Sequence, residues 1–407
     1  MSAVRSRSSF RRGHPGFGLV EIMVGLVIGL IGVLVIYQVY NVAEGFKRNT
    51  TAAGEAQIAG LFSSFVLGME IANGGAGIAI SAPDLASCAD TGDIATTFRP
   101  IPVLITDGGA AGTPDSFVVT YSVATTLVTP SIFNFDAAAN DPYHVQSPQG
   151  FLPGDMIVAI AAPGSVGSDC VSSVIAAGGV SVPTIRVPPP LINETPTNVA
   201  DVTITHSGTV SPATQLRGDG RPGLSTLFNM GPCNKVQKVR YDVSNGTLRA
   251  TPLLDTSGAN CGKPADPLVP NPLASNIVNM KVEYGIDSDL DPQGLLDTWV
   301  QASAAGWDPA TLLPAPIAQI NQIKAIRIGI IVQSEQFDKD LAGYTGGDYV
   351  NGAYNWVLFD CANANKALCP GRLTGSVPAS VSPPGNWRFR KYETVIPLRN
   401  EIWNKQS

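Results

Sequence analysis

The chain of 407 residues contains little charge and almost no histidine. Only 14% of its residues are Asp, Glu, Lys or Arg, against about a quarter in an ordinary soluble protein. It has three histidines, and none of its six cysteines stands in a C-x-x-C pair, so the usual ligand patterns of a zinc site are missing. Beyond residue 16 only His144 and His206 remain as candidate general bases, and neither adjoins a recognisable nucleophile motif. The composition argues against a zinc site and against an enzyme.

One long segment lacks charge altogether. The 22 residues from Ile22 to Ala43 include no Asp, Glu, Lys or Arg. A helix of that length rises about 33 Å, which is enough to cross a bilayer. An ordinary secretory signal is disfavoured, because its apolar core usually runs about 7 to 15 residues and ends at a small-residue cleavage site. The segment therefore predicts a membrane anchor.

Three features coincide at the start of this segment. A leader with four arginines and no acid ends at Gly16, Phe17 follows, and a lone carboxylate, Glu21, stands at the edge of the apolar run. An acid drawn towards the bilayer centre costs about 2.5 to 3.5 kcal/mol, so its presence needs a reason. A plain signal anchor, which stays open as the alternative, supplies none. The motif GFGLVE resembles the cleavage and assembly signal of type IV prepilins and of the related secretion pseudopilins.

That resemblance implies a role for each residue of the motif. A prepilin peptidase that is also an N-methyltransferase would cut between Gly16 and Phe17 and methylate the new amine of Phe17. Glu21 would then meet the free N-terminal amine of a neighbouring subunit. The basic leader favours a cytoplasmic N-terminus and export of the remaining chain.

Small residues recur within the anchor at three- and four-residue steps, at Gly25, Gly29 and Gly32. Such residues let apolar helices approach closely, which would make them a packing face between subunits. Glycine is also common in membrane helices in general, so both interpretations remain open.

Helical periodicity continues beyond the anchor. Apolar residues recur at three- and four-residue steps at Ile58, Leu61, Phe62, Phe65, Val66 and Met69. Asn73 and the two glycines after it are typical of a helix C-terminus. The pattern predicts one helix from Phe17 to Ala72, whose amphipathic second half packs into an exported head.

Composition predicts a β-rich head behind this helix, because 42 Gly and 32 Pro supply many turns. The expected parts are a leader at 1–16, the membrane-spanning half of the helix at 17–43, its exported half at 44–75 and a globular head at 76–407. The sequence leaves open whether the head forms one lobe or two. The predicted fold class is α+β, a long N-terminal helix packed on a β-rich head as in type IV pilins. Removing the leader leaves 22 basic against 32 acidic residues, a net charge of −10 that argues against a general nucleic-acid surface.

Strand signals recur through the head. The clearest is a hairpin, VQKVRYDV and TLRATPL around Asn245 and Gly246, a dipeptide favoured in two-residue turns. Further predicted strands are Phe117 to Val123, Met156 to Ile160, Thr184 to Val187, Val202 to Thr205, Ile277 to Tyr284, Ile323 to Val332, Tyr354 to Phe359 and Arg388 to Leu398.

All six cysteines lie on the exported side, where an even number indicates disulfides. Six cysteines allow fifteen connectivities, and proximity in sequence favours two pairs. These are Cys361 with Cys369 and Cys233 with Cys261, which leaves Cys88 with Cys170.

Carboxylates at alternate positions form the single candidate metal site. Asp287, Asp289 and Asp291 begin a pattern that resembles a calcium loop, and Asp297 follows six residues later. Pro292 stands where an EF-hand loop needs Gly, and Thr298 where it needs the bidentate acid. Calcium and a solvated acidic turn are therefore both open, and no cofactor is otherwise indicated.

Several segments of the head resemble the PilW family of type IV pilus minor pilins. They are GTPDSFVVTY, FLPGDMIVAI, KVRYDVSNGTLRA, NIVNMKVEYGIDSDLD, IKAIRIGIIVQSE and FRKYETVIPLRN. The resemblance implies a non-enzymatic subunit that helps to initiate pilus assembly in a tip or priming complex. Its expected partners are other minor pilins, the major pilin, the prepilin peptidase and the inner-membrane assembly platform.

The same resemblance implies a location and leaves alternatives. The subunit would be embedded in the inner membrane with its head in the periplasm, and would later enter the pilus. A pseudopilin of a type II secretion system, related to pseudopilin J, is the alternative within this class. A membrane-anchored exported enzyme or receptor is the alternative outside it.

Overall fold

The computed structural model describes the residues that follow. They are 16, 18–77, 101–109, 112–123, 130–138, 141–147, 150–160, 170–186, 199–207, 215–216, 225–258, 261–288, 296–313, 315, 317–335, 348–350, 353–360, 373–376 and 387–398. The chain divides into two compact units, Met1–Gly54 and Glu55–Ser407, and each is described by itself.

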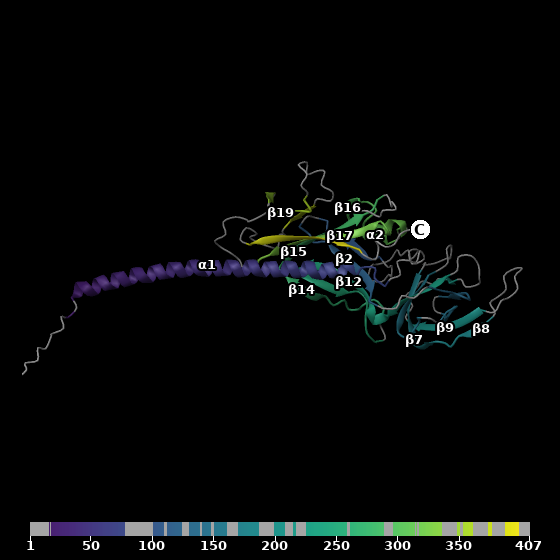
Figure 1. The fold of residues 1–407 in the computed structure, drawn as a ribbon. Coiled ribbons are helices and arrows are strands. Elements are labelled where there is room, and N and C mark those ends of the chain that lie inside the picture. Colours follow the sequence, from purple (N-terminus) through teal and green to yellow (C-terminus); the bar gives the residue numbers. More distant parts are fainter. Residues whose placement is uncertain are drawn as a thin grey trace, which may run out of the picture. The chain divides into compact units, whose positions relative to one another are not determined.

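One helix, α1 (Leu19–Ala72), runs through 54 residues and contributes to both units (Figure 1). It contains no proline, so its backbone hydrogen bonds are uninterrupted. At its end the Asn73 amide donates to the carbonyl of Met69, and Gly75 takes a φ of 78°, a left-handed conformation common after helices. The predicted end at Ala72 is confirmed.

Small and large side chains together form the face of α1 that packs into the head. Ala56, Gly60, Ser63, Leu67 and Ile71 are buried and follow one another at steps of three or four residues. Gly60 lies against Tyr392 of β21 (Phe389–Pro397), where a larger side chain on the helix would not fit. The head therefore holds α1 through a close contact at Gly60 and through the buried Leu67 and Ile71.

The apolar residues marked by the sequence pattern lie on the other side of α1. Ile58 is 70% exposed and Phe65 69%, and Leu61, Phe62 and Met69 are also exposed. The prediction that the second half of α1 packs into the head is confirmed, but this exposed apolar face is not the one that does so.

Two antiparallel sheets share one core with the end of α1. Their strand orders are β16-β15-β17-β21 and β1-β2-β12-β13-β14. The bounds are β1 (Val103–Thr106), β2 (Ser116–Ser122), β12 (Val236–Ser244), β13 (Thr247–Pro252), β14 (Asn271–Ser275), β15 (Ile277–Ile286), β16 (Thr298–Gln301) and β17 (Ile323–Gln333). Alternate side chains of β15 and β17 point into this core, among them Tyr284, whose hydroxyl accepts from the Ile105 amide at 2.5 Å.

Asp115, just before β2, joins the two sheets. Its amide donates to the carbonyl of Met280, and its carboxylate accepts from the Val282 amide at 2.9 Å and from Lys281 Nζ at 2.7 Å. Burial raises the pKa of Asp115, and the Lys281 ammonium opposes that rise. Asp115 thus supplies hydrogen-bond partners to the Met280 carbonyl, the Val282 amide and Lys281 Nζ, all of which are buried.

A seven-stranded sheet builds further clusters of buried apolar side chains. The order of its strands is β3-β11-β6-β7-β9-β5, and β8 pairs with β9. The strands β4 and β10 form a separate two-stranded sheet. The bounds are β3 (Ser131–Ile132), β4 (Ala137–Ala138), β5 (Tyr143–Val145), β6 (Asp155–Ile160), β7 (Cys170–Val180), β8 (Thr184–Arg186), β9 (Val199–Ser207), β10 (Gln215–Leu216) and β11 (Thr226–Pro232). The short helices are η2 (Cys233–Lys235), α2 (Pro309–Leu312) and α3 (Ile317–Ile320).

A three-stranded sheet packs on the four-stranded one. It consists of β18 (Asp348–Val350), β19 (Ala353–Leu358) and β20 (Leu373–Ser376). Leu358 sits over Gly329 of β17, where an added Cβ would lie 2.9 Å from the leucine. Because Ile328 and Ile330 point into the core shared with α1, Gly329 belongs to the opposite face. The four-stranded sheet is thus covered on both faces.

Every strand predicted from the sequence is present, with ends displaced by a few residues. The predicted hairpin joins β12 and β13, and its turn residues Asn245 and Gly246 have φ of 51° and 71°. Positive φ at both positions is what a type I′ turn requires.

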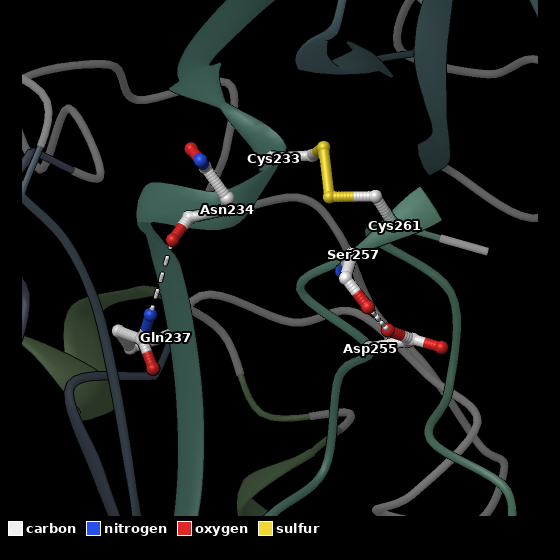
Figure 2. The surroundings of a disulfide bond; sticks show 6 residues. All are labelled: Cys233, Asn234, Gln237, Asp255, Ser257 and Cys261. Atoms are coloured by element: carbon white, nitrogen blue, oxygen red, sulfur yellow. Dashed lines mark hydrogen bonds between the residues drawn. A yellow bond between two sulfur atoms is a disulfide. The ribbon is translucent and has the colours of Figure 1, made fainter. Parts of the chain in front are cut away.

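One disulfide lies within the described residues and joins Cys233 of η2 to Cys261 (Figure 2). Its Cα atoms are 5.7 Å apart, and it closes a separation of 28 residues. This predicted pair is confirmed. Cys88, Cys361 and Cys369 lie outside the described residues, as does the side chain of Cys170.

Candidate functional site

The N-terminal motif lies at the beginning of α1. Gly16 is exposed, Phe17 lies outside the described residues, and Glu21 occupies the first turn of the helix. The amide of Glu21 donates to the carbonyl of Gly18 at 2.9 Å, and its side chain is exposed. A carboxylate in the first turn complements the positive end of the helix dipole. Glu21 is therefore presented outward at the start of a regular helix.

The first half of α1 is apolar on every side. Its exposed apolar residues, each at least half exposed, include Leu19, Val20, Ile22, Met23, Val24, Leu26, Val27, Ile28, Leu30, Ile31, Val33, Leu34, Val35, Ile36, Tyr37, Val39, Tyr40, Val42 and Phe46. No atom lies within 4 Å of a Cβ built on Gly25, Gly29 or Gly32. By length and composition this is the one described helix able to span a membrane. A helix that is apolar all round needs lipid or other helices as its surroundings.

An exposed apolar face continues along the second half of α1. We call Ile58, Leu61, Phe62, Phe65 and Met69 the outer stripe. Their three- and four-residue spacing places them on one side of the helix. Monomeric soluble proteins rarely leave such a contiguous run of large apolar side chains uncovered. The outer stripe is thus a candidate interface.

The inner side of the same helix end is fixed to the head by polar contacts. The hydroxyl of Tyr121 on β2 donates to Glu70 at 2.7 Å. Burial and the nearby Glu70 carboxylate raise the pKa of Tyr121, so the phenol remains a donor. Together with the buried Leu67 and Ile71, this contact fixes how the helix turns its outer stripe away from the head.

The sequence pattern did not indicate the inner face, although a signal for it exists. Ala56, Ala59, Gly60 and Ser63 are small residues at helical spacing. Small residues mark close helix contacts in membranes, and here they mark the contact of a helix with a sheet.

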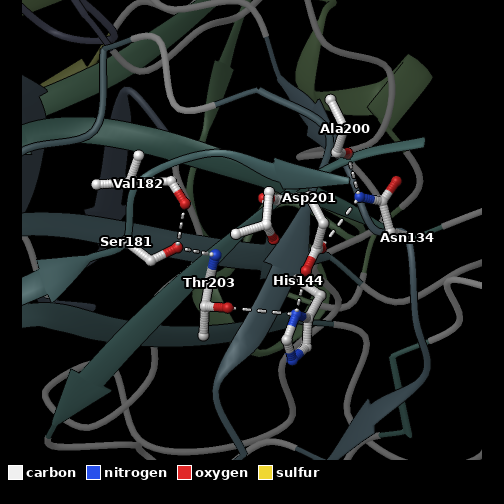
Figure 3. A network of polar contacts seen from close by, with 8 residues as sticks. Asn134, His144, Ser181, Val182, Ala200, Asp201 and Thr203 are labelled. Carbon is white, nitrogen blue, oxygen red and sulfur yellow. Dashed lines mark hydrogen bonds and ion pairs between the residues drawn. The ribbon is translucent and has the colours of Figure 1, made fainter. Parts of the chain in front are cut away.

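The two candidate bases belong to a structural network rather than to a catalytic arrangement. His144 Nδ1 lies 2.9 Å from Asp201 Oδ2, and the buried Asp201 also accepts from Asn134 (Figure 3). Thr203 Oγ1 lies 3.4 Å from His144 Nδ1. His206 Nε2 lies 2.9 Å from the carbonyl of Asp141, and burial lowers its pKa. These contacts tie β5 to β9.

The structure describes only part of the predicted calcium loop. Asp289 and Asp291 lie outside the described residues. Asp297 accepts from both the amide and the hydroxyl of Ser288, at 2.7 and 2.9 Å, and the Asp287 amide donates to the carbonyl of Gln322. Among the described residues no group of three or more His, Cys, Asp and Glu could hold a metal ion.

Two family models match the chain. Residues 11–37 match the prokaryotic N-terminal methylation motif, and residues 240–400 match Type IV Pilus-assembly protein W. Residues 240–400 thus form a PilW-type region, and residues 11–37 a prepilin-type N-terminus. The second match begins in β12 and takes in the four-stranded and three-stranded sheets. Neither matching model describes an enzyme.

Comparison of structures and sequences adds two findings. A type IV-like pilin from Thermus thermophilus aligns with 13% sequence identity and a TM-score of 0.22, covering 62% of this chain and 86% of that one. No curated protein sequence matches the chain. The likeness of this chain to type IV pilus proteins rests on the N-terminal motif and on the PilW region. Together with the apolar helix they indicate a membrane-anchored subunit with an exported head.

Proposed function

We propose that this chain is a minor pilin that helps to initiate type IV pilus assembly within a complex of other minor pilins at the filament tip. The outer stripe is the observation that carries the proposal. The head covers the inner face of α1 with Tyr392 and Ile396 but leaves Phe65 and its apolar neighbours uncovered. A helix with one face held by its own head and the other exposed suits lateral packing against helices of neighbouring subunits.

The proposal assigns an order of events to the N-terminal residues. Residues 1–16 form a leader that the prepilin peptidase removes after Gly16, and the amine of Phe17 is then methylated. Residues 17–43 hold the subunit in the inner membrane with the head in the periplasm, until the assembly platform moves it into a filament. Glu21 then pairs with the N-terminal amine of an adjoining subunit, because an acid surrounded by apolar helices gains most from a cationic partner.

Intact-mass analysis of the purified chain tests the processing step. We expect a mature chain that begins at Phe17 and carries a methyl group. A retained leader, or a cut near Ala43, would contradict the assignment of Gly16 and Phe17.

The assembly role is tested by substitution of Glu21. Glu21→Ala is expected to leave the membrane-held, folded chain at its normal level and to reduce its amount in sheared pili. Glu44→Ala is the matched control, because Glu44 lies in the same helix and pairs with Arg48 on its surface. Equal loss from the pili in both variants would count against a specific role for Glu21. Deleting the chain, counting pili and assaying secretion in parallel separates a pilus subunit from a secretion pseudopilin.

A further inference from the structure

An ion pair lies buried between the four-stranded and the three-stranded sheets. Glu283 of β15 stands opposite Arg327 of β17, and Arg327 Nε is 2.5 Å from Glu283 Oε2. The arginine side chain is 7% exposed and the glutamate 0%. Glu283 Oε1 is buried, and no described residue hydrogen-bonds to it. The carboxylate is therefore only half satisfied, which is costly for a buried charge.

Two aromatic rings hold the guanidinium of Arg327 between them. The ring centroid of Trp299 lies 4.5 Å from the guanidinium carbon, and that of Phe359 lies 4.2 Å from it. Trp299 belongs to β16 of the four-stranded sheet, whereas Phe359 directly follows β19 of the three-stranded sheet. Each contact is within the distance at which a cation is attracted to the face of a ring. Arg327 thus connects the two sheets.

Phe359 adopts an unusual backbone conformation in this position. Its φ is 56°, in the left-handed region that bulky residues rarely enter. The amide of Phe359 donates to Glu393 Oε1 of β21 at 2.9 Å, and Lys391 Nζ donates to the carbonyl of Val357 at 2.8 Å. The contact with Arg327 and these two hydrogen bonds hold the residue there.

Apolar packing completes the contact between the sheets. Leu358 lies over Gly329, and Trp356 packs in a buried cluster with Val278 and Ile331. The contact surface is therefore a small apolar patch with the Arg327 and Glu283 charges at its edge.

Several charges act on Glu283 from the surrounding elements. The pKa of Glu283 is raised to about 7, because burial raises it by more than Arg327 of β17 lowers it. Asp115, before β2, and Asp107, after β1, contribute to the rise, although Asp115 is paired with Lys281 on the same strand as Glu283. Glu393 of β21 favours the charged form of Arg327. Glu283 is thus neutral or charged within the range of pH that an exported head meets.

We propose that the three-stranded sheet β18–β19–β20 is a cover whose closure on β17 depends on the charge of Glu283. The cover closes more firmly when the carboxyl is neutral, because an ionised carboxylate pairs with Arg327 through Oε2 alone and leaves a charged Oε1 buried. Opening admits water to Glu283 and returns its affinity for protons towards that of an ordinary glutamate. Between about pH 4.5 and 7 the closed form therefore binds more protons than the open form, so raising the pH favours opening. The opening equilibrium rises about twentyfold from pH 5.5 to pH 7.5.

Hydrogen exchange in the full mature chain, held in detergent micelles, tests this coupling. The backbone amides from Asn355 to Phe359 are followed at pH 5.5, 6.5 and 7.5, and each rate is divided by the intrinsic rate at that pH. We expect their protection to fall about twentyfold across the series. Amides of the β12–β13 hairpin, from Tyr241 to Ala250, are the internal control and are expected to keep constant protection.

Two variants identify the group responsible. Glu283→Gln keeps the size of the side chain without its charge, so protection of the cover should remain high at all three pH values. Glu393→Ala removes the acceptor of the Phe359 amide, so protection should be lower throughout while its dependence on pH persists.

The outcomes that overturn the proposal are distinct. They are a flat profile for the unmodified chain, a parallel fall in the control hairpin, or an unchanged slope in Glu283→Gln. The profile of the unmodified chain decides the matter alone should Glu283→Gln fail to fold.

Discussion

Gly60 of α1 lies directly against the ring of Tyr392 on β21, so that a Cβ on the glycine would stand 2.0 Å from the ring carbon Cε2. This contact sets how close the helix comes to the sheet. It also explains why the small residues of α1 face inward and the outer stripe faces outward.

Gly60→Ala is expected to destabilise the head by about 1 to 3 kcal/mol, the usual cost of overpacking. The tyrosine ring must move, and with it the apolar packing around the helix. Thermal unfolding of the full chain in detergent, followed by near-ultraviolet circular dichroism, measures the change.

The matched control is Gly54→Ala in the same helix. A Cβ at Gly54 meets no atom within 4 Å, so the substitution should be neutral or stabilise the helix by about 0.5 to 1 kcal/mol. Combining Gly60→Ala with Tyr392→Ala should cost less than the sum of the two single changes. Strict additivity would show that the contact is not what limits the helix.

The disulfide between Cys233 and Cys261 is expected to stabilise the head. It closes a separation of 28 residues, for which the chain-entropy estimate is about 3.5 kcal/mol. Replacing both cysteines with alanine should lower the unfolding temperature, and reducing agent should then have a smaller effect on that variant than on the parent. An unchanged unfolding temperature would mean that the surrounding packing alone holds this region.

His206 is expected to make the stability of the head depend on pH. Its ring packs against that of Tyr143 with the ring centroids 4.0 Å apart, and burial lowers its pKa below the ordinary 6.5. The unfolded chain therefore takes up a proton near pH 6.5 while the folded chain does not, so stability falls as the pH drops below that value.

The measurement for His206 compares the unfolding midpoint at pH 7.5 and pH 5.5. His206→Gln retains a donor for the carbonyl of Asp141 but does not titrate, so its loss of stability over this interval should be smaller than that of the parent. Because Glu283 contributes in the opposite direction, the difference between the two proteins is the quantity that matters. Equal losses would contradict the assignment.

The outer stripe is expected to govern incorporation and not folding. Phe65→Gln removes a large side chain that is 69% exposed in the isolated chain, so the unfolding temperature should hardly change. Burial of a phenylalanine against a neighbour contributes about 1.5 to 3 kcal/mol, so the amount of the variant in sheared pili should fall about tenfold or more. Ile185→Gln on β8 is the control, because Ile185 is 75% exposed but lies away from the helix. An equal fall for both would show a general effect of lost surface hydrophobicity.

The length and the end of α1 and the positions of the strands could be predicted because they depend on local signals. An unbroken helical pattern up to Ala72, glycines after it, and the Asn245–Gly246 turn determine backbone conformation within a few residues. The pairing of Cys233 with Cys261 followed from their proximity. Such features need no knowledge of the distant chain.

The face of α1 that meets the head could not be predicted in the same way. An apolar stripe such as Ile58 to Met69 indicates burial but does not say whether the chain itself or another subunit provides the cover. Glu283 and Arg327 present a similar difficulty. They alternate with apolar residues along β15 and β17, as on a solvated sheet face, yet the three-stranded sheet buries them.

The most direct test of the account is a photocrosslink from position 65 in assembled pili. A photoreactive residue in place of Phe65 is predicted to crosslink to the N-terminal helix of an adjoining subunit, whereas the same residue in place of Ile185 is not. If position 65 gave no crosslink to any helix while the subunit was present in the pilus, the outer stripe would not be the assembly interface.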